Sequence, residues 1–124
     1  MAPLSIAICI VALAMANDPN EVSRTKEDTY KPLKATKAQT EALHKIDDKY
    51  GIMLAKLRKD NPADYTVKRD ALNDKYTHDF IGALTPIQKS TYRKYVRSLR
   101  QNYIKAHPEV DADNIFIWGG ANIV

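Results

Sequence analysis

The sequence predicts an all-α fold of about three amphipathic helices in a long helical-hairpin arrangement, with flexible termini. Two observations predict it. A threonine–glutamine helix-start signal occurs twice, at Thr36–Gln39 and Thr85–Gln88, and apolar residues recur at helical spacing after each. The 124 residues suggest one domain, and the charged fraction of 27% and hydrophobic fraction of 44% are typical of globular proteins. The net charge of +4 permits binding to acidic surfaces without requiring it.

Residues 1–16 are expected to be a secretory signal peptide. The uncharged apolar run from Leu4 to Ala14 leads into small residues at Ala14 and Ala16, which predicts cleavage after Ala16. The run is too short to span a bilayer comfortably. It lacks the Lys or Arg that usually precedes the apolar part of a signal peptide. The alternative is an uncleaved N-terminal anchor or a buried helix. We therefore expect a periplasmic or otherwise secreted protein. Its one cysteine, Cys9, falls in this segment, so the mature chain would have no thiol chemistry.

Residues 17–35 are polar and interrupted by Pro19 and Pro32, which predicts a flexible lead-in with at most a short helical turn. The first long helix is expected from Thr36 to about Lys59. Thr36 and Gln39 form a capping box, in which each side chain accepts a hydrogen bond from the backbone amide of the other residue. The apolar face of this helix consists of Ala42, Leu43, Ile46, Tyr50, Met53, Leu54 and Leu57.

The second helix is expected from Ala63 to about Ala83. Asp60–Pro62 would end the first helix, with Asn61 capping the second and Pro62 at its first position. Its buried side is predicted to consist of Val67, Ala71, Leu72, Tyr76, Phe80 and Ile81.

The third helix begins with the second helix-start motif and ends before Pro108. Leu84 precedes the N-cap Thr85, Pro86 occupies the first helical position, and Gln88 completes the capping box. After this start, an apolar stripe recurs at helical spacing through Tyr92, Tyr95, Val96, Leu99 and Tyr103.

The third helix is also strongly basic on one side. Lys89, Arg93, Arg97 and Arg100 fall within a sector of roughly 80° on a helical wheel. No acidic residue occurs between Asp79 and Glu109. The pattern indicates a basic amphipathic helix that binds a partner or a membrane surface; the alternative is a solvated face beside core tyrosines. The candidate protein-binding residues are Lys89, Tyr92, Arg93, Tyr95, Arg97 and Arg100.

Residues 108–124 form a C-terminal tail of a different character. An acidic, turn-like stretch reaches Asp113, and a short apolar run, Ile115–Trp118, follows it. The run could pack on the helices, pair as a strand or stay exposed, and the sequence leaves these three outcomes open.

The two helix starts form an internal repeat. Ala35–Gln39 superposes on Leu84–Gln88, and the apolar positions that follow match in part. Together with the signal peptide and the small helical chain, this repeat resembles the LTXXQ-motif family of Spy/CpxP-like periplasmic stress proteins. The resemblance covers roughly Thr36 to Lys105, within a predicted helical domain of residues 36–107. The second motif fits in full, whereas the first has Ala35 in place of leucine.

The resemblance implies a helical hairpin that dimerises into a curved cradle. It also implies either ATP-independent chaperone activity toward unfolded periplasmic proteins or regulation of an envelope-stress sensor, and some relatives bind zinc. This chain departs from the family in its apolar tail and its polar lead-in. A homodimer is the assembly that the resemblance implies for this chain.

Other classes of function are less favoured. No enzyme motif appears, and His44, His78 and His107 lie on separate predicted segments, so we expect no enzyme and no cofactor. Asp48 lies four residues after His44, and Asp74 lies four residues before His78, so either pair could bind a metal on one helix face. Surface pairs of this kind are more often solvated, and no metal site is predicted. The basic helix would suit nucleic acid locally, but the signal peptide argues against it. Membrane contact through this helix and the tail is possible but not favoured.

The sequence therefore predicts an ATP-independent periplasmic chaperone-like protein. It would bind unfolded or partner proteins through the basic, tyrosine-bearing helix. The alternative is an envelope-stress or metal-responsive regulator that binds a sensor domain. Both functions need the same helices, so the sequence does not separate them.

Overall fold

Helices dominate the described chain, which confirms the predicted all-α class. The structure is a computed structural model and describes residues 20–22 and 24–121; the predicted signal peptide lies outside these residues. The long helices are α3 (Lys37–Asp60), α4 (Tyr65–Gly82) and α5 (Pro86–Ala106). The short elements are β1 (Glu21–Val22), α2 (Lys26–Tyr30), η1 (Lys31–Leu33), η2 (Ala112–Asn114) and β2 (Phe116–Ile117).

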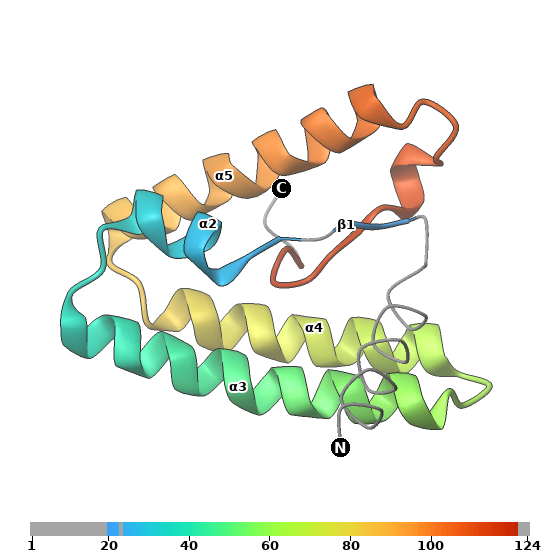
Figure 1. The fold of residues 1–124 in the computed structure, drawn as a ribbon, viewed down its shortest axis with the longest axis horizontal. Coiled ribbons are helices and arrows are strands. Elements are labelled where there is room, and N and C mark those ends of the chain that lie inside the picture. The colour runs from blue at the N-terminus through green and yellow to red at the C-terminus, as the bar shows by residue number, and fades with distance from the viewer. Residues whose placement is uncertain (1–19, 23, 122–124) are drawn as a thin grey trace, which may run out of the picture.

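The elements form three layers, as Figure 1 shows. The first layer is the α3–α4 hairpin, and α5 forms the opposite layer. Between them lie α2, β1 and the C-terminal segment. Across the hairpin, the Tyr50 hydroxyl donates to Asp79 Oδ2 at 2.5 Å, and the Tyr50 ring lies 5.5 Å from that of Tyr76. The predicted hairpin is therefore present, and the middle layer lies between it and much of α5, which approaches α4 directly where the Phe80 and Tyr92 rings pack.

Both predicted capping boxes are confirmed. The Thr36 hydroxyl accepts from the Gln39 amide at 3.1 Å, and the Thr85 hydroxyl accepts from the Gln88 amide at 3.3 Å. Each glutamine Oε1 accepts in return from the amide of its threonine. These bonds satisfy backbone donors that the first turn of a helix leaves without partners, so α3 and α5 begin where the sequence predicts.

The two capping boxes also bond to each other. The carboxamides of Gln39 and Gln88 exchange hydrogen bonds, and Gln88 Nε2 donates to Gln39 Oε1 at 3.0 Å. Gln39 Nε2 donates further to the Ala83 carbonyl at 3.0 Å, and Gln88 Nε2 to the Leu33 carbonyl at 3.1 Å. The repeated motif therefore starts two helices and also joins their N-termini.

Replacing Thr85 with Ala is expected to lower the free energy of unfolding by about 1 kcal/mol, because the N-cap hydroxyl bond is lost. A shift of the urea midpoint, measured by circular dichroism, checks this loss. Thr91→Ala on the same helix is the control, because the Thr91 hydroxyl bonds only to the Ile87 carbonyl within the helix. An unchanged midpoint for Thr85→Ala would count against the cap.

The junction between α3 and α4 differs from the prediction. Asn61 is the C-cap of α3 rather than the N-cap of α4; its φ is 42° and its amide donates to the Leu57 carbonyl at 2.9 Å. Asparagine tolerates this left-handed backbone better than most residues. Pro62 then lies in a turn closed by the Tyr65 amide, so α4 begins at Tyr65.

The buried face of α4 also differs from the prediction. Tyr76 and Phe80 are buried as expected, but Val67 is 70% exposed and Ala71 is exposed. Polar residues take part in the buried side, which consists of Arg69, Asn73, Tyr76, Thr77 and Phe80. Apolar periodicity did not indicate this face because the partner that covers it, the C-terminal tail, accepts and donates hydrogen bonds.

The expected flexible lead-in forms packed structure in its described part. Val22, Thr29 and Leu33 are buried, and the Thr25 hydroxyl caps α2. β1 pairs in parallel with β2 of the tail, with Glu21 opposite Phe116 and Val22 opposite Ile117. A polar composition predicted flexibility, but long-range pairing with the tail decides the structure.

The tail takes two of the three outcomes that the sequence left open, since it pairs as a strand and packs on the helices. Ile115, Phe116 and Ile117 are all buried. Contact with a membrane through these side chains would require their exposure. The two ends of the described chain thus meet in the middle layer of the fold.

Candidate functional site

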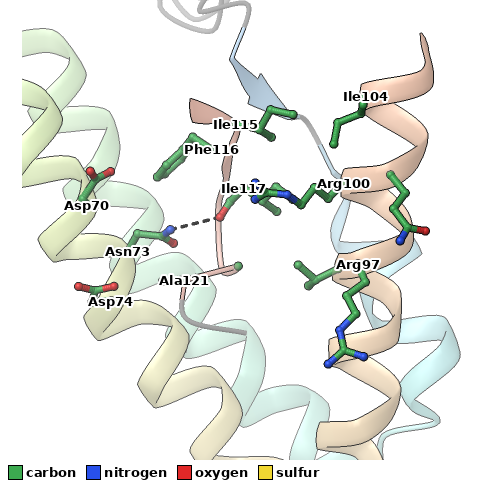
Figure 2. A pocket seen from close by; sticks show the side chains of 13 residues that line it. Asp70, Asn73, Asp74, Arg97, Arg100, Ile104, Ile115, Phe116, Ile117 and Ala121 are labelled. Atoms are coloured by element: carbon green, nitrogen blue, oxygen red, sulfur yellow. Dashed lines mark hydrogen bonds between the residues drawn. The ribbon is translucent and has the colours of Figure 1, made fainter. Parts of the chain in front are cut away.

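A cleft opens between α4 and α5, and the C-terminal tail forms its floor (Figure 2). Its volume is about 540 Å³, a size typical of ligand-binding clefts. The α4 wall is formed by Asp70, Asn73 and Asp74; the α5 wall by Val96, Arg97, Arg100, Gln101 and Ile104; and the floor by Ile115, Phe116, Ile117, Gly120 and Ala121.

The floor is fastened to α4 by the polar residues of that helix. Asn73 is 5% exposed, and its Nδ2 donates to the Ile117 carbonyl at 3.2 Å while its Oδ1 accepts from the Gly119 amide at 2.7 Å. The Thr77 hydroxyl accepts from the Ala121 amide at 3.2 Å. These side chains satisfy the buried backbone of the tail, which explains why α4 buries polar residues.

The tail is fastened to α5 as well. The Tyr92 hydroxyl donates to the Gly119 carbonyl at 2.9 Å, and Arg100 Nη2 donates to the Ala112 carbonyl at 2.8 Å. The tail therefore acts as a spacer that keeps the two helices apart. Because the tail is hydrogen-bonded to both helices, the fold fixes the position of the cleft floor.

The two walls of the cleft carry opposite charges. Figure 2 shows Asp70 and Asp74 on one side and Arg97 and Arg100 on the other. Arg97 is exposed, and the Asp70 side chain keeps 57% of its surface exposed although it also accepts from Arg69. The floor between them is apolar, so the cleft can hold an apolar group with opposite charges on its two sides.

Of the predicted protein-binding residues, only Arg97 and Arg100 line the cleft. Arg93 is exposed on α5 outside the cleft, and Lys89 and Tyr95 are half-buried. The prediction that Tyr92 belongs to the binding surface is wrong, because its side chain is fully buried.

Tyr92 is buried because it packs against both α4 and the middle layer. Its ring centroid lies 4.9 Å from that of Phe80, and the guanidinium of Arg24 lies 5.7 Å from the Tyr92 ring. Burial raises the pKa of Tyr92 to about 12, so the hydroxyl stays protonated and donates to the tail. Of the two interpretations of the tyrosine stripe, the core interpretation holds for this residue.

Arg24 is the centre of a network that the sequence did not indicate. Its Nε donates to the Trp118 carbonyl at 2.6 Å, its Nη1 to the Thr29 hydroxyl at 2.6 Å, and its Nη2 to the Tyr76 hydroxyl at 3.1 Å. One guanidinium thus joins the N-terminal segment, α4 and the tail. A lone arginine in a polar segment gives no sequence signal for such a role.

Asp47 on α3 completes this network. It accepts hydrogen bonds from the hydroxyls of Tyr30 and Tyr76, and the latter hydroxyl connects it to Arg24. Burial raises the pKa of Asp47, although the Tyr76 hydrogen bond and the charge of Arg24 act in the opposite direction. Burial acts to lower the pKa of Arg24, but Tyr92, Tyr76 and Asp47 outweigh it and the pKa is raised. The hydrogen bonds of the network join the middle layer to the α3–α4 hairpin, and α5 meets it through the Tyr92 ring beside Arg24.

The described residues hold no group of three or more His, Cys, Asp or Glu side chains that could bind a metal ion. The His78 ring lies beside Asp79, with 3.5 Å between Nδ1 and Oδ1, and 89% of its side chain is exposed. In the part of the chain that the structure describes, no helix combines the length and the apolar character needed to cross a bilayer.

Comparisons with family models, curated proteins and solved structures found no match for this chain. The resemblance to the LTXXQ-motif family therefore remains a prediction from the two motifs and their context.

Proposed function

We propose that this protein is an ATP-independent chaperone-like protein that binds unfolded or partner proteins through the basic face of α5. The observation that carries the proposal is the position of this face. Arg93 and Arg97 are exposed on a helix of 21 residues that contains no acidic residue, and the face continues into a cleft with an apolar floor. Cationic and apolar surface are thus adjacent.

Such a surface suits unfolded clients, which present apolar and charged groups without a fixed geometry. Arginine can pair with carboxylates and also stack on aromatic side chains. Long-range attraction would speed encounter with acidic clients and would weaken as salt screens it.

A variant with Arg93→Ser, Arg97→Ser and Arg100→Ser is expected to lose about tenfold in apparent affinity for an acidic unfolded client. Each charge pair with a client contributes roughly 0.5 kcal/mol, and the three losses add to about the energy of a tenfold change. Arg100 is half-buried and also donates to the Ala112 carbonyl, so an unchanged urea midpoint must accompany the loss of affinity. The measurement is light scattering from a denatured acidic client diluted into buffer with and without the protein, at low and high salt and without ATP. Suppression of scattering should weaken with salt.

The matched control removes the same charge elsewhere. Lys45→Ser, Lys56→Ser and Lys75→Ser change exposed lysines of the α3–α4 hairpin and should leave suppression intact. No suppression by the native protein at several-fold excess would sink the chaperone proposal. Equal losses in both variants would show that net charge, rather than the face of α5, does the binding.

The second candidate is a regulator that binds one sensor domain. The observation that favours it is the hydrogen-bonded cleft, since a preformed shape can select a single partner. Titration with a purified sensor domain separates the two functions. Tight one-to-one binding favours regulation, and weak binding to many unfolded chains favours the chaperone. Periplasmic location and a homodimer belong to the same proposal and are tested by cell fractionation and sedimentation of the full chain.

A further inference from the structure

We propose that the cleft between α4 and α5 binds an extended polypeptide segment that carries an apolar side chain between a basic and an acidic residue. This inference rests on the proposed function and names the part of a client that the protein would recognise. The basic residue would face Asp70 and Asp74, and the acidic residue would face Arg97 and Arg100.

The charge arrangement argues for a ligand with both signs of charge. An anion alone would be attracted by Arg97 but repelled by Asp70 and Asp74. A cation alone would be attracted by the two aspartates but repelled by Arg97. Only a ligand with separated opposite charges gains at both walls. The walls reach solvent, because Asp70, Asp74 and Arg97 are exposed, so a chain can reach the cleft from outside.

The floor argues for an apolar group at the centre of the ligand. The half-buried Ile104 of α5 and Ala121 of the tail line the cleft of about 540 Å³ together with Ile115 and Ile117, which are mostly packed in the core and expose only a small apolar area to it. Water on such a floor is displaced favourably by an apolar side chain. In an extended chain the central side chain points away from its two neighbours, so a chain that crosses the cleft from wall to wall directs its apolar side chain to the floor and leaves one charged residue at each wall.

The cleft is preformed, which lowers the entropic loss on binding. The Asn73 carboxamide makes hydrogen bonds to the tail with both its nitrogen and its oxygen, and the Tyr92 hydroxyl bonds to the same tail from α5. A client chain would therefore meet fixed walls. Selectivity would come from the order of charges in the client, while its apolar residue could vary.

The experiment is fluorescence anisotropy with three labelled peptides of equal length in extended form. The first has a lysine, a central leucine and a glutamate, the second has glutamine in place of both charges, and the third has glutamate in place of the lysine. The native protein should bind the first peptide about tenfold more tightly than either of the others. Equal affinity for all three would overturn the inference.

Matched variants place the binding in the cleft. Arg97→Glu should weaken binding of the first peptide about tenfold, whereas Lys94→Glu, exposed on the same helix outside both the cleft and the basic face, should change it less than about twofold. Gln101→Trp, at an exposed position of the cleft wall, should block binding without changing charge. A urea midpoint equal to that of the native protein shows that each variant folds.

The outcomes separate this inference from the function on which it rests. Scattering suppression that depends on Arg93 as strongly as on Arg97, with no preference among the peptides, would overturn the cleft inference and keep the chaperone proposal. Selective peptide binding that Arg97→Glu and Gln101→Trp abolish would support the inference, even if suppression of aggregation failed and the sensor-binding alternative took its place.

Discussion

Replacing Arg24 with Ala is expected to lower the free energy of unfolding by about 3 kcal/mol, because the half-buried Asp47 loses a balancing charge. The Trp118 carbonyl, the Thr29 hydroxyl and the Tyr76 hydroxyl also lose a charged donor. The same substitution removes one connection between the N-terminal segment and the tail, while the pairing of β1 with β2 remains. Urea denaturation, followed by circular dichroism and by the fluorescence of Trp118, measures the loss.

The control for this prediction is Lys26→Ala. Lys26 pairs with Asp48 at 2.9 Å, but both side chains are more than half exposed, so the change in stability should stay within about 0.5 kcal/mol. A loss for Arg24→Ala no greater than that for Lys26→Ala would show that the buried network contributes little.

The effect of Arg24→Ala should also depend on pH. Burial raises the pKa of Asp47 in the folded protein, and Arg24 acts to lower it. A carboxyl with a raised folded pKa weakens folding when ionised, and this penalty disappears as the pH falls through the folded value. Removing Arg24 raises the pKa of Asp47 further. The stability difference between the native protein and the variant should therefore shrink from neutral to mildly acidic pH.

Replacing Gly119 with Ala is expected to lower the free energy of unfolding by about 3 kcal/mol. Gly119 has a φ of +82°, which costs other residues about 1–2 kcal/mol. An added Cβ would also lie 2.7 Å from the Tyr92 hydroxyl oxygen and would overlap the guanidinium of Arg24, whose hydrogen bonds hold it in place. The urea midpoint measures the loss.

Gly51→Ala is the matched control for the glycine substitution. An added Cβ at Gly51 meets nothing within 4 Å, and the residue lies in the interior of α3. Alanine there should raise stability by roughly 0.5–1 kcal/mol, because it favours the helix more than glycine does. Similar destabilisation by the two substitutions would contradict the close approach of the tail to Arg24 and Tyr92.

The helix starts could be predicted because capping is a local interaction. Thr36 with Gln39, and Thr85 with Gln88, lie close enough in the chain to bond in any protein that forms the helix. The end of α3 at Asp60 followed equally from the asparagine and proline that come after it. What could not be predicted was the bond between the two glutamines, because it needs α3 and α5 to begin side by side.

The buried face of α4 shows the limit of apolar periodicity. Val67 fits the apolar pattern but is exposed, and Asn73 breaks the pattern but is buried. Asn73 is buried because the tail offers it a carbonyl and an amide. Periodicity assumes that the partner surface is apolar, and here the partner is backbone.

The candidate site was found in part. Arg97 and Arg100 were predicted from the basic sector of α5, and they line the cleft. Asp70 and Asp74 on the facing wall belong to another helix, and nothing in their spacing places them opposite the arginines. Tyr92 was misplaced because a helical stripe with tyrosines has the same pattern whether it faces a client or the core.

By itself, the sequence determined the helical class, the start of α3 and of α5, and the basic sector of α5. These properties arise from hydrogen bonds and side-chain spacing within a few residues of chain. Only the tertiary structure decided that the N-terminal segment and the tail pair between the helices, that Arg24 connects the layers, and that opposite charges face each other across a cleft. Those features depend on contacts between distant residues, which only the packed chain brings together.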